Sequence, residues 1–258
     1  MDGLPAGLGQ FLIGGGSITT PARSTVRLTI PAKPRGYADA QLDDTQRLAR
    51  RRFRWTPPVG MSVRARASSA SPLGTLGFGF WNDPFAVSLG QSGAARRFPA
   101  APQAVWFFFG SPPNDLAFSS RVSGHGWKAV SLRFRPLPVA VLGPLAAAGV
   151  LLSRLPPLRR PVVEAARRMA VADEAELRTP LDEWHTYRLR WQPGQAAFEV
   201  DGETVLVAPS PPPGRLGFVT WIDNQYAIAS PESGIAFGLL PTDQTQWLEL
   251  CDLRIEEI

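Results

Sequence analysis

The chain has 258 residues, and 44% of them are hydrophobic, so it holds enough apolar material for a packed core and general disorder is excluded. Its 26 prolines and 24 glycines lie between short apolar runs, which favours many short strands over long helices. The lone cysteine, Cys251, excludes an internal disulfide, and the net charge of +5 comes almost wholly from arginine.

The predicted elements begin after residues 1–22, which are rich in glycine and proline and indicate a loose arm crossing the outside of a sheet. Beyond this arm, short apolar runs alternate with turn residues, and we take residues 23–258 as a single domain. The pattern predicts an all-β fold, a two-sheet antiparallel β-sandwich or jelly roll. The expected strands are Ser24–Ile30, Gly36–Leu42, Arg51–Thr56, Met61–Ser69, Thr75–Asn82, Ala104–Phe109, Trp127–Arg135, Trp184–Trp191, Ala196–Val200, Glu203–Val207, Gly214–Ile222 and Trp247–Glu256.

A helical and apolar insertion at residues 136–182 interrupts these strands. Leu137–Leu152 is almost wholly apolar, and Pro161–Leu177 has apolar residues at helix spacing. At about 16 residues, the apolar piece is shorter than the ~20 residues that cross a bilayer. Residues 137–177 therefore form either an ordinary insertion packed on the sandwich or an amphipathic lid or membrane-surface hairpin, whose Arg159 and Arg160 could contact lipid phosphates.

The clearest strand pattern lies in Trp184–Gly202. Alternate residues from Tyr187 to Trp191 are apolar with arginines between them, and Pro193-Gly194 supplies the turn to a return strand. This stretch resembles the "fHtY...W...i.fyvDG" segment of the concanavalin A-like lectin/glucanase superfamily, and within it is most similar to glycoside hydrolase family 16. Further similar segments follow in the family's order at residues 37–44, 53–66, 74–83 and 247–256. The resemblance implies a jelly roll that handles saccharides.

The resemblance also implies where catalytic acids would stand. In the family, the strand after the segment that matches 74–83 carries E-x-D-x-E or E-x-D-x-x-E, whose alternate acids point into the cleft as nucleophile and general acid. The corresponding strand here, Ala104–Gly110, has four aromatic residues and no acid. An aromatic ring can neither protonate a leaving oxygen nor attack an anomeric carbon, so we expect the family's hydrolase chemistry to be absent.

Aromatic residues on the predicted strands are candidate platforms for a ligand. A sugar ring's apolar face, or an apolar chain, stacks on such rings by burying carbon surface. Core packing is the alternative, because strand alternation does not say which face of a strand is wet. The candidates are Trp81, Trp106, Phe108, Trp221 and Tyr226.

Polar residues follow two of these aromatic strands directly. At strand ends they are placed to bind sugar hydroxyls or hold a cation, and Asp83 and Asp223 could act together as an acid/base pair. Turn formation is the alternative role, since Asn and Asp are favoured in turns. The polar candidates for ligand binding are Asn82, Asp83, Asp223 and Gln225.

The two histidines do not supply a multi-histidine metal site, so no metal or other cofactor is expected, and a structural calcium ion has no specific signal. His125 lies in a Ser-Gly-His-Gly loop and is either a further acid/base candidate or a plain loop residue, whereas His185 matches a structural position of the resembled segment. No nucleic-acid motif accompanies the arginine clusters, which are either solvated faces or sites for another anionic partner.

Three functions fit this pattern. The first is a binding module for a carbohydrate or glycoconjugate, and the second is an enzyme of different chemistry acting on an apolar or amphiphilic substrate in an aromatic-lined cleft. The third is a membrane-surface or protein-interaction domain that uses residues 137–177. The chain opens without a basic and apolar leader, which favours a cytoplasmic location with membrane association left open.

Overall fold

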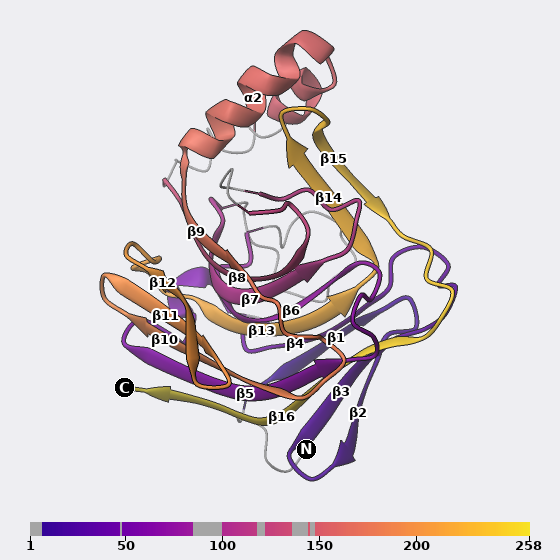
Figure 1. Ribbon diagram of the computed structural model, residues 1–258, viewed down its shortest axis with the longest axis vertical. Helices are drawn as coiled ribbons and strands as arrows, with labels where there is room; N and C mark the ends of the chain where they lie inside the picture. The colour runs from indigo at the N-terminus through magenta and orange to yellow at the C-terminus, as the bar shows by residue number, and fades with distance from the viewer. Residues whose placement is uncertain (1–6, 47, 85–99, 118–121, 136–143, 145–147) are drawn as a thin grey trace.

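The computed structural model describes residues 7–46, 48–84, 100–117, 122–135, 144 and 148–258. These residues form two seven-stranded antiparallel sheets packed face to face, together with a separate two-stranded hairpin (Figure 1). The predicted all-β sandwich is therefore confirmed.

Sheet A contains, in spatial order, β1 (Gly9–Ile13), β4 (Asp39–Asp43), β13 (Gly217–Asp223), β6 (Thr75–Trp81), β7 (Gln103–Gly110), β8 (Gly126–Phe134) and β9 (Ala170–Glu176). Sheet B contains β12 (Glu203–Ala208), β11 (Gln195–Val200), β10 (His185–Gln192), β5 (Val59–Ala67), β16 (Gln246–Glu257), β3 (Thr25–Ile30) and β2 (Ser17–Ala22). The remaining elements are η1 (Arg50–Arg52), α2 (Pro156–Arg168), and the hairpin of β14 (Gln225–Ser230) and β15 (Gly234–Leu239).

The core between the sheets is built by strand alternation. On β10, Tyr187, Leu189 and Trp191 are at most 1% exposed, whereas Arg188 and Arg190 point to solvent. The turn after this strand places Gly194 at φ 81°, a conformation that favours glycine. Because each fully buried side chain of this kind stabilises the fold by about 2 kcal/mol, the register of β10 is strongly specified.

The N-terminal region differs from the predicted loose arm. Residues 9–13 form β1, which pairs with β4 at the edge of sheet A, and residues 17–22 form β2, which pairs with β3 at the edge of sheet B. Pro21 lies where the β2–β3 register shifts between Thr19 and Ala22. Edge strands tolerate proline at such irregularities because one side of the ladder needs no partner, so glycine and proline did not exclude strands here.

Two further predicted elements differ from the structure. The predicted strand at 51–56 is replaced by η1 and an isolated bridge between Trp55 and Leu216, where the Trp55 indole N–H donates to Asp44 at 2.6 Å. The predicted helix at 161–177 begins earlier and ends at Arg168, and β9 then pairs with β8. Residues 170–176 form a strand because they hydrogen-bond to the otherwise unpaired edge of β8. The local spacing of apolar residues gives no sign of this pairing.

The prediction for the apolar stretch concerns residues that are only partly described. Its positions 137–143 and 145–147 lie outside the described residues, and residues 148–153 are helical. No helix among the described residues combines the length and apolar character needed to cross a membrane.

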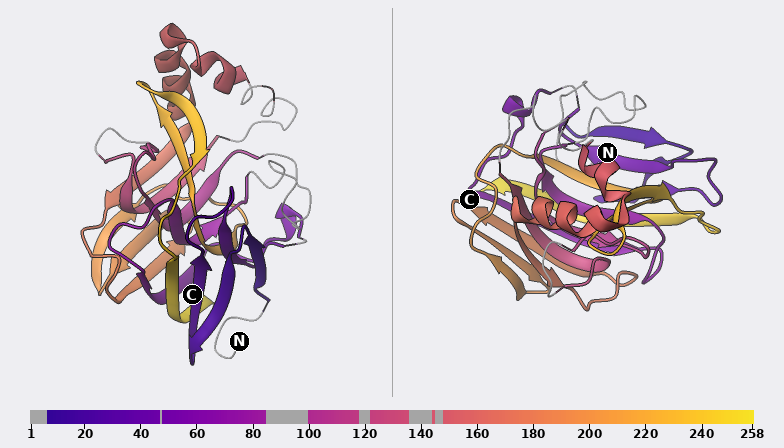
Figure 2. Two further views of the ribbon diagram at one scale, coloured as in Figure 1. Left: turned by 90° about the vertical axis from the view of Figure 1, so that its right-hand side faces the viewer. Right: turned by 90° about the horizontal axis from the view of Figure 1, so that it is seen from above.

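The arrangement of layers positions the site. Figure 1 shows sheet A curving between sheet B on one side and α2 with the β14–β15 hairpin on the other. The face of sheet A turned away from sheet B is therefore its concave face, and α2 and the hairpin stand over it at one end of the molecule (Figure 2).

Candidate functional site

Four aromatic side chains gather on the concave face of sheet A, and we call them the aromatic cluster: Trp81, Trp106, Phe108 and Trp221. Ring centroids are 5.1 Å apart for Trp106 and Trp221 and 5.9 Å apart for Trp81 and Trp106. Phe108 and Trp221 are 9% and 8% exposed, whereas Trp81 and Trp106 are half-buried. The two latter rings therefore offer the accessible surface of the cluster.

The other face of β7 belongs to the core. Val105, Phe107 and Phe109 are at most 5% exposed and pack in the main cluster between the sheets. The alternation along β7 therefore directs Trp106 and Phe108 to the concave face, a choice that the sequence left open.

Two glycines of β6 make room for the cluster. Gly77 lies between Trp221 and Phe108 in the register, and Gly79 lies next to Trp106. A Cβ atom at Gly77 would stand 2.7 Å from the Trp221 ring, and one at Gly79 would stand 2.6 Å from the Trp106 Cβ. The alternating glycines of the Gly-Phe-Gly-Phe segment are thus the sequence signal for this close approach, and sequence reasoning did not use it.

A pair of buried acids lies beside the cluster, and we call it the acid pair: Asp39 of β4 and Asp223 of β13. They stand directly opposite each other on neighbouring strands, which places their Cβ atoms about 4.5–5.5 Å apart. Asp39 is 2% exposed and Asp223 is 7% exposed, and the Oδ1 atom of Asp39 has no hydrogen-bond partner among the described residues. Sequence reasoning proposed Asp223 but missed Asp39.

The surroundings of the acid pair favour its protonated forms. Burial raises the pKa of Asp223 to about 7, although hydrogen bonds from Thr75 and Gln225 oppose the rise. Burial, and next the charge of Asp223, raises the pKa of Asp39 well above its usual range. Burial also raises the pKa of Tyr37, whose hydroxyl is hydrogen-bonded to Asp39. Burial of both carboxyl groups therefore favours their neutral forms over their charged forms.

A hydrogen-bond chain joins the acid pair to the aromatic cluster. The Trp221 indole N–H donates to the Thr75 hydroxyl at 2.9 Å, and that hydroxyl donates to Asp223 Oδ1 at 2.8 Å. The backbone N–H groups of Thr75 and Gln225 donate to the same carboxylate oxygen. The orientation of the Trp221 ring and the position of Asp223 are thus coupled.

The far side of the concave face carries a buried ion pair. Lys128, which is opposite Phe108 on β8, donates to Glu174 of β9 at 3.2 Å, and their side chains are 2% and 0% exposed. The Lys128 ammonium also donates to the carbonyls of Leu116 and Ser123. Since these partners engage the cation fully, we assign it the structural task of holding Leu116 and Ser123 in place before β8.

The structure separates two of the predicted site residues. Asp223 is opposite Thr75 at one end of β6, whereas Asp83 follows the other end. Eight residues of extended strand span about 26 Å, so Asp83 and Asp223 cannot form the predicted acid/base pair. The Asn82 side chain binds the Ala101 carbonyl and the Gln103 N–H, and the Asn82 backbone carbonyl accepts from Arg50. These bonds give Asn82 the turn-forming role that was the alternative to ligand binding.

The remaining predicted residues lie apart from the cluster. His125 is an exposed loop residue, with its Nδ1 3.2 Å from the Ser123 hydroxyl, and three strand spacings of about 14 Å separate β8 from β13. Gln225 uses its backbone N–H to hold Asp223. Tyr226 packs against Gly238 inside the hairpin. His185 pairs with Asp201 on sheet B at 2.6 Å, consistent with a structural role.

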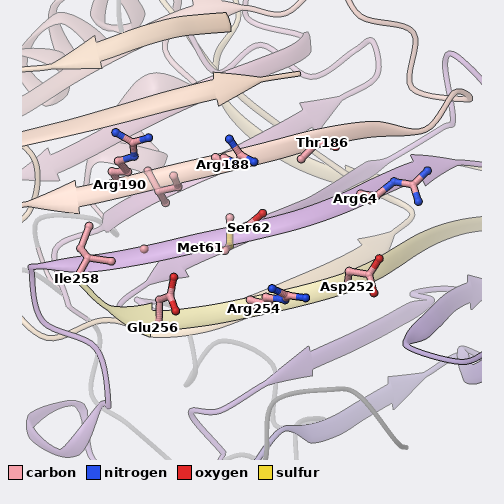
Figure 3. Close-up of a pocket in the computed structure, with 12 residues that line it drawn as sticks. Met61, Ser62, Arg64, Thr186, Arg188, Arg190, Asp252, Arg254, Glu256 and Ile258 are labelled. Carbon is pink, nitrogen blue, oxygen red and sulfur yellow. The ribbon is translucent and has the colours of Figure 1, made fainter. Parts of the chain in front are cut away.

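No group of three metal-binding side chains occurs within the described parts of the chain. A hollow of about 600 Å³ lies on the outer face of sheet B (Figure 3). Its floor is β5 with Gly60 and Ser62, flanked by Arg188 and Arg190 of β10 and by Arg254 of β16. We call it the arginine groove; it contains none of the predicted site residues.

No protein-family model and no curated protein matches this chain. Solved structures do match. A legume lectin-like domain from Entamoeba histolytica is 8% identical with a TM-score of 0.50, over 98% of this chain and 90% of that one. An immunostimulatory antigen and pseudo beta-1,3-glucanase of Mycobacterium tuberculosis is 10% identical with a TM-score of 0.48, over 93% and 78%. A sialidase is 8% identical with a TM-score of 0.42, and this chain spans only 17% of its length. The fold is thus similar to that of the legume lectin-like domain, a two-sheet β-sandwich.

Proposed function

We propose that the concave face of sheet A binds a carbohydrate or glycoconjugate, as in a lectin. The observation that carries this proposal is the position of Trp81 and Trp106, whose half-buried rings lie 5.9 Å apart on that face. Gln41 of β4, opposite Trp221, adds an amide on the same face. Rings that present apolar area beside a few polar groups suit a sugar, which has one apolar face and a rim of hydroxyls.

We further propose that the chain is a catalytically degenerate sandwich similar to glycoside hydrolase family 16. The support comes from β7, where concave-face positions are occupied by Trp106 and Phe108 instead of carboxylates. In this proposal residues 23–258 are one domain, and residues 136–182 are its insertion.

The test is a panel of neutral and acidic oligosaccharides, followed by calorimetric titration of any that bind. Trp106→Ala removes an accessible ring, so we expect about tenfold weaker binding without turnover. Trp184→Ala on sheet B, whose ring lies under Arg66 at 4.8 Å, is the matched control and should bind normally. The proposal fails if the unmodified chain binds no oligosaccharide, or if both variants bind equally well.

The acid pair favours a second candidate function, acid–base catalysis on a glycan or amphiphilic substrate. Retaining glycosidases use two carboxyl groups about 5–5.5 Å apart, and the opposed positions of Asp39 and Asp223 are compatible with such a spacing. We rank this function second because both acids are more than nine-tenths buried, whereas Trp81 and Trp106 are accessible.

Catalysis by the acid pair makes its own prediction. Asp39→Asn and Asp223→Asn should each abolish turnover of a chromogenic glycoside or ester, and activity should change near pH 7, where the pKa of Asp223 lies. Asp83→Asn is the matched control, because Asp83 lies at the other end of β6. Turnover that survives both substitutions in the acid pair would exclude this role.

A further inference from the structure

One end of the molecule carries an exposed apolar surface, which we call the tip: residues 148–159 together with residues 234–237 of β15. Four of the nine large hydrophobic side chains that are exposed in the described chain belong to it, with Phe237 68% and Leu151 62% exposed. The four are Leu151, Leu152, Leu155 and Phe237. Such clustering differs from the scattered single apolar residues that are normal on protein surfaces.

The two segments of the tip are held side by side. The Ile235 N–H donates to the Ser153 hydroxyl at 3.2 Å, and the Arg159 guanidinium donates to the Ser153 carbonyl at 3.3 Å. Val150 and Phe237 line one hollow between the segments. Figures 1 and 2 show α2 and the hairpin projecting together from the sandwich, on the side away from sheet B.

Val163 anchors this projection. Its side chain is 1% exposed, and it lines a small apolar cavity of about 70 Å³ with Ile235 and Leu116. Leu116 also packs against the aromatic cluster. The tip is therefore attached to the concave face, and its exposed leucines and Phe237 do not hold the fold together.

The charge around the apolar surface is positive. Residues 148–168 contain five arginines and one glutamate, and residues 225–239 contain one glutamate, which leaves a net charge of +3. Glu164 is engaged by Arg160 at 2.8 Å. Arg154 and Arg159 line the hollow beside Phe237, so guanidinium groups flank the exposed apolar side chains directly.

We propose that the tip docks onto an anionic phospholipid surface, with Phe237 and the leucines inserted at the acyl boundary and the arginines on the phosphates. A projecting end with large apolar side chains and flanking arginines matches the layered chemistry of a bilayer interface. Guanidinium groups bind phosphate in a bidentate manner, which gives the charge complementarity. Docking of this kind is peripheral and independent of carbohydrate binding.

The experiment is co-sedimentation with vesicles of phosphatidylcholine alone and with vesicles that also contain phosphatidylserine. We expect the unmodified chain to sediment with the anionic vesicles, and the L151S/F237S double variant to lose this binding by at least about tenfold. Arg154→Gln should weaken binding to anionic vesicles about fivefold. The matched controls, Val207→Ser and Arg188→Gln on sheet B, should bind as the unmodified chain does.

Thermal melting of each variant checks that the fold is intact, which we expect because the substituted side chains are exposed. Equal sedimentation with both vesicle types, or full binding by the double variant, would overturn the proposal. Light scattering supplies a separate outcome: a dimer that dissociates in the double variant would assign the tip to a second copy of the chain and also overturn it.

Discussion

Strand alternation builds both outward faces of the sandwich, but one face is largely buried and the other is charged and exposed. On β13 of sheet A every residue is buried, so the concave face holds aromatic rings and acids that are largely removed from water. On β10 of sheet B buried residues alternate with exposed ones, so the outer face holds solvated arginines. The difference indicates that the candidate site is distinguished by strands that are buried on both faces, more than by the amino-acid composition of those strands.

The buried acid Glu249 of sheet B and the acid pair of sheet A are stabilised in different ways. On sheet B the Glu249 carboxylate is 3% exposed and accepts from Arg27 at 2.7 Å and Arg66 at 2.8 Å. These guanidiniums also lie over Trp247, with Arg27 4.6 Å from the ring centroid. Among the described residues, no ion pair joins a cation to Asp39 or Asp223. Their raised pKa values indicate that protonation neutralises these carboxyls instead.

Of the substitutions that test this comparison, Asp223→Asn is expected to change the free energy of unfolding most. The carboxyl has a pKa of about 7 in the fold and about 4 in the unfolded chain, so the folded state loses stability as pH rises from 4 to 7 and stays lower above that. Asn keeps an oxygen acceptor for Thr75 but does not ionise. Its stability relative to the unmodified chain should therefore grow by up to about 4 kcal/mol between pH 4 and pH 8.

Urea denaturation at several pH values measures this change. Asp252→Asn on sheet B is the matched control, because its side chain is exposed and Asn also adopts its φ of 54°. A stability difference between the Asp223 variant and the unmodified chain that does not vary with pH would show that Asp223 is not desolvated.

A smaller loss, of about 3 kcal/mol, is expected from Gly77→Ala. The added Cβ would collide with the Phe107 carbonyl and would stand 2.7 Å from the Trp221 ring, so the ring or the strand must move. Gly60→Ala on sheet B is the control, because its Cβ would stand 3.0 Å from the side chain of Ile258, which can move, and 3.9 Å from Glu256, an ordinary contact distance. Denaturation midpoints that fall equally for both variants would contradict the special packing of the concave face.

The smallest effect, a loss of about 2 kcal/mol, is expected from Glu249→Gln, which leaves two arginines without their anionic partner. Glu256→Gln, on the exposed face of the same strand, serves for comparison and should change little. If chemical denaturation gives the same stability for both variants, the arginines of sheet B are stabilised by solvent and not by Glu249.

Strands with local alternation could be predicted from the sequence. β10 and β11 have their pattern and turn within 16 consecutive residues, and the structure places them as expected. β1 and β9 could not be predicted, because each is stabilised by pairing with a strand that lies far away along the chain. β2 pairs with the next strand, β3, but Pro21 and the register shift between Thr19 and Ala22 hide its strand pattern. The β14–β15 hairpin was also missed, since its residues bury little surface of their own.

The candidate site could likewise be predicted only in part from the sequence. The aromatic residues and Asp223 were recognisable by type and by their places on strands, but Asp39 was not, because its partner is far away along the chain. The separation of Asp83 from Asp223 likewise depends on the direction of β6, with Thr75 and not Trp81 next to Asp223.

The sequence by itself determined an all-β sandwich, because alternation and turn residues act over a few neighbouring positions. Only the tertiary structure decided that Trp106 faces the concave side and Phe107 the core, since that depends on which side sheet B covers. It also decided that Asp39 and Asp223 meet, because burial and the pairing of β4 with β13 arise only when the chain closes into two layers.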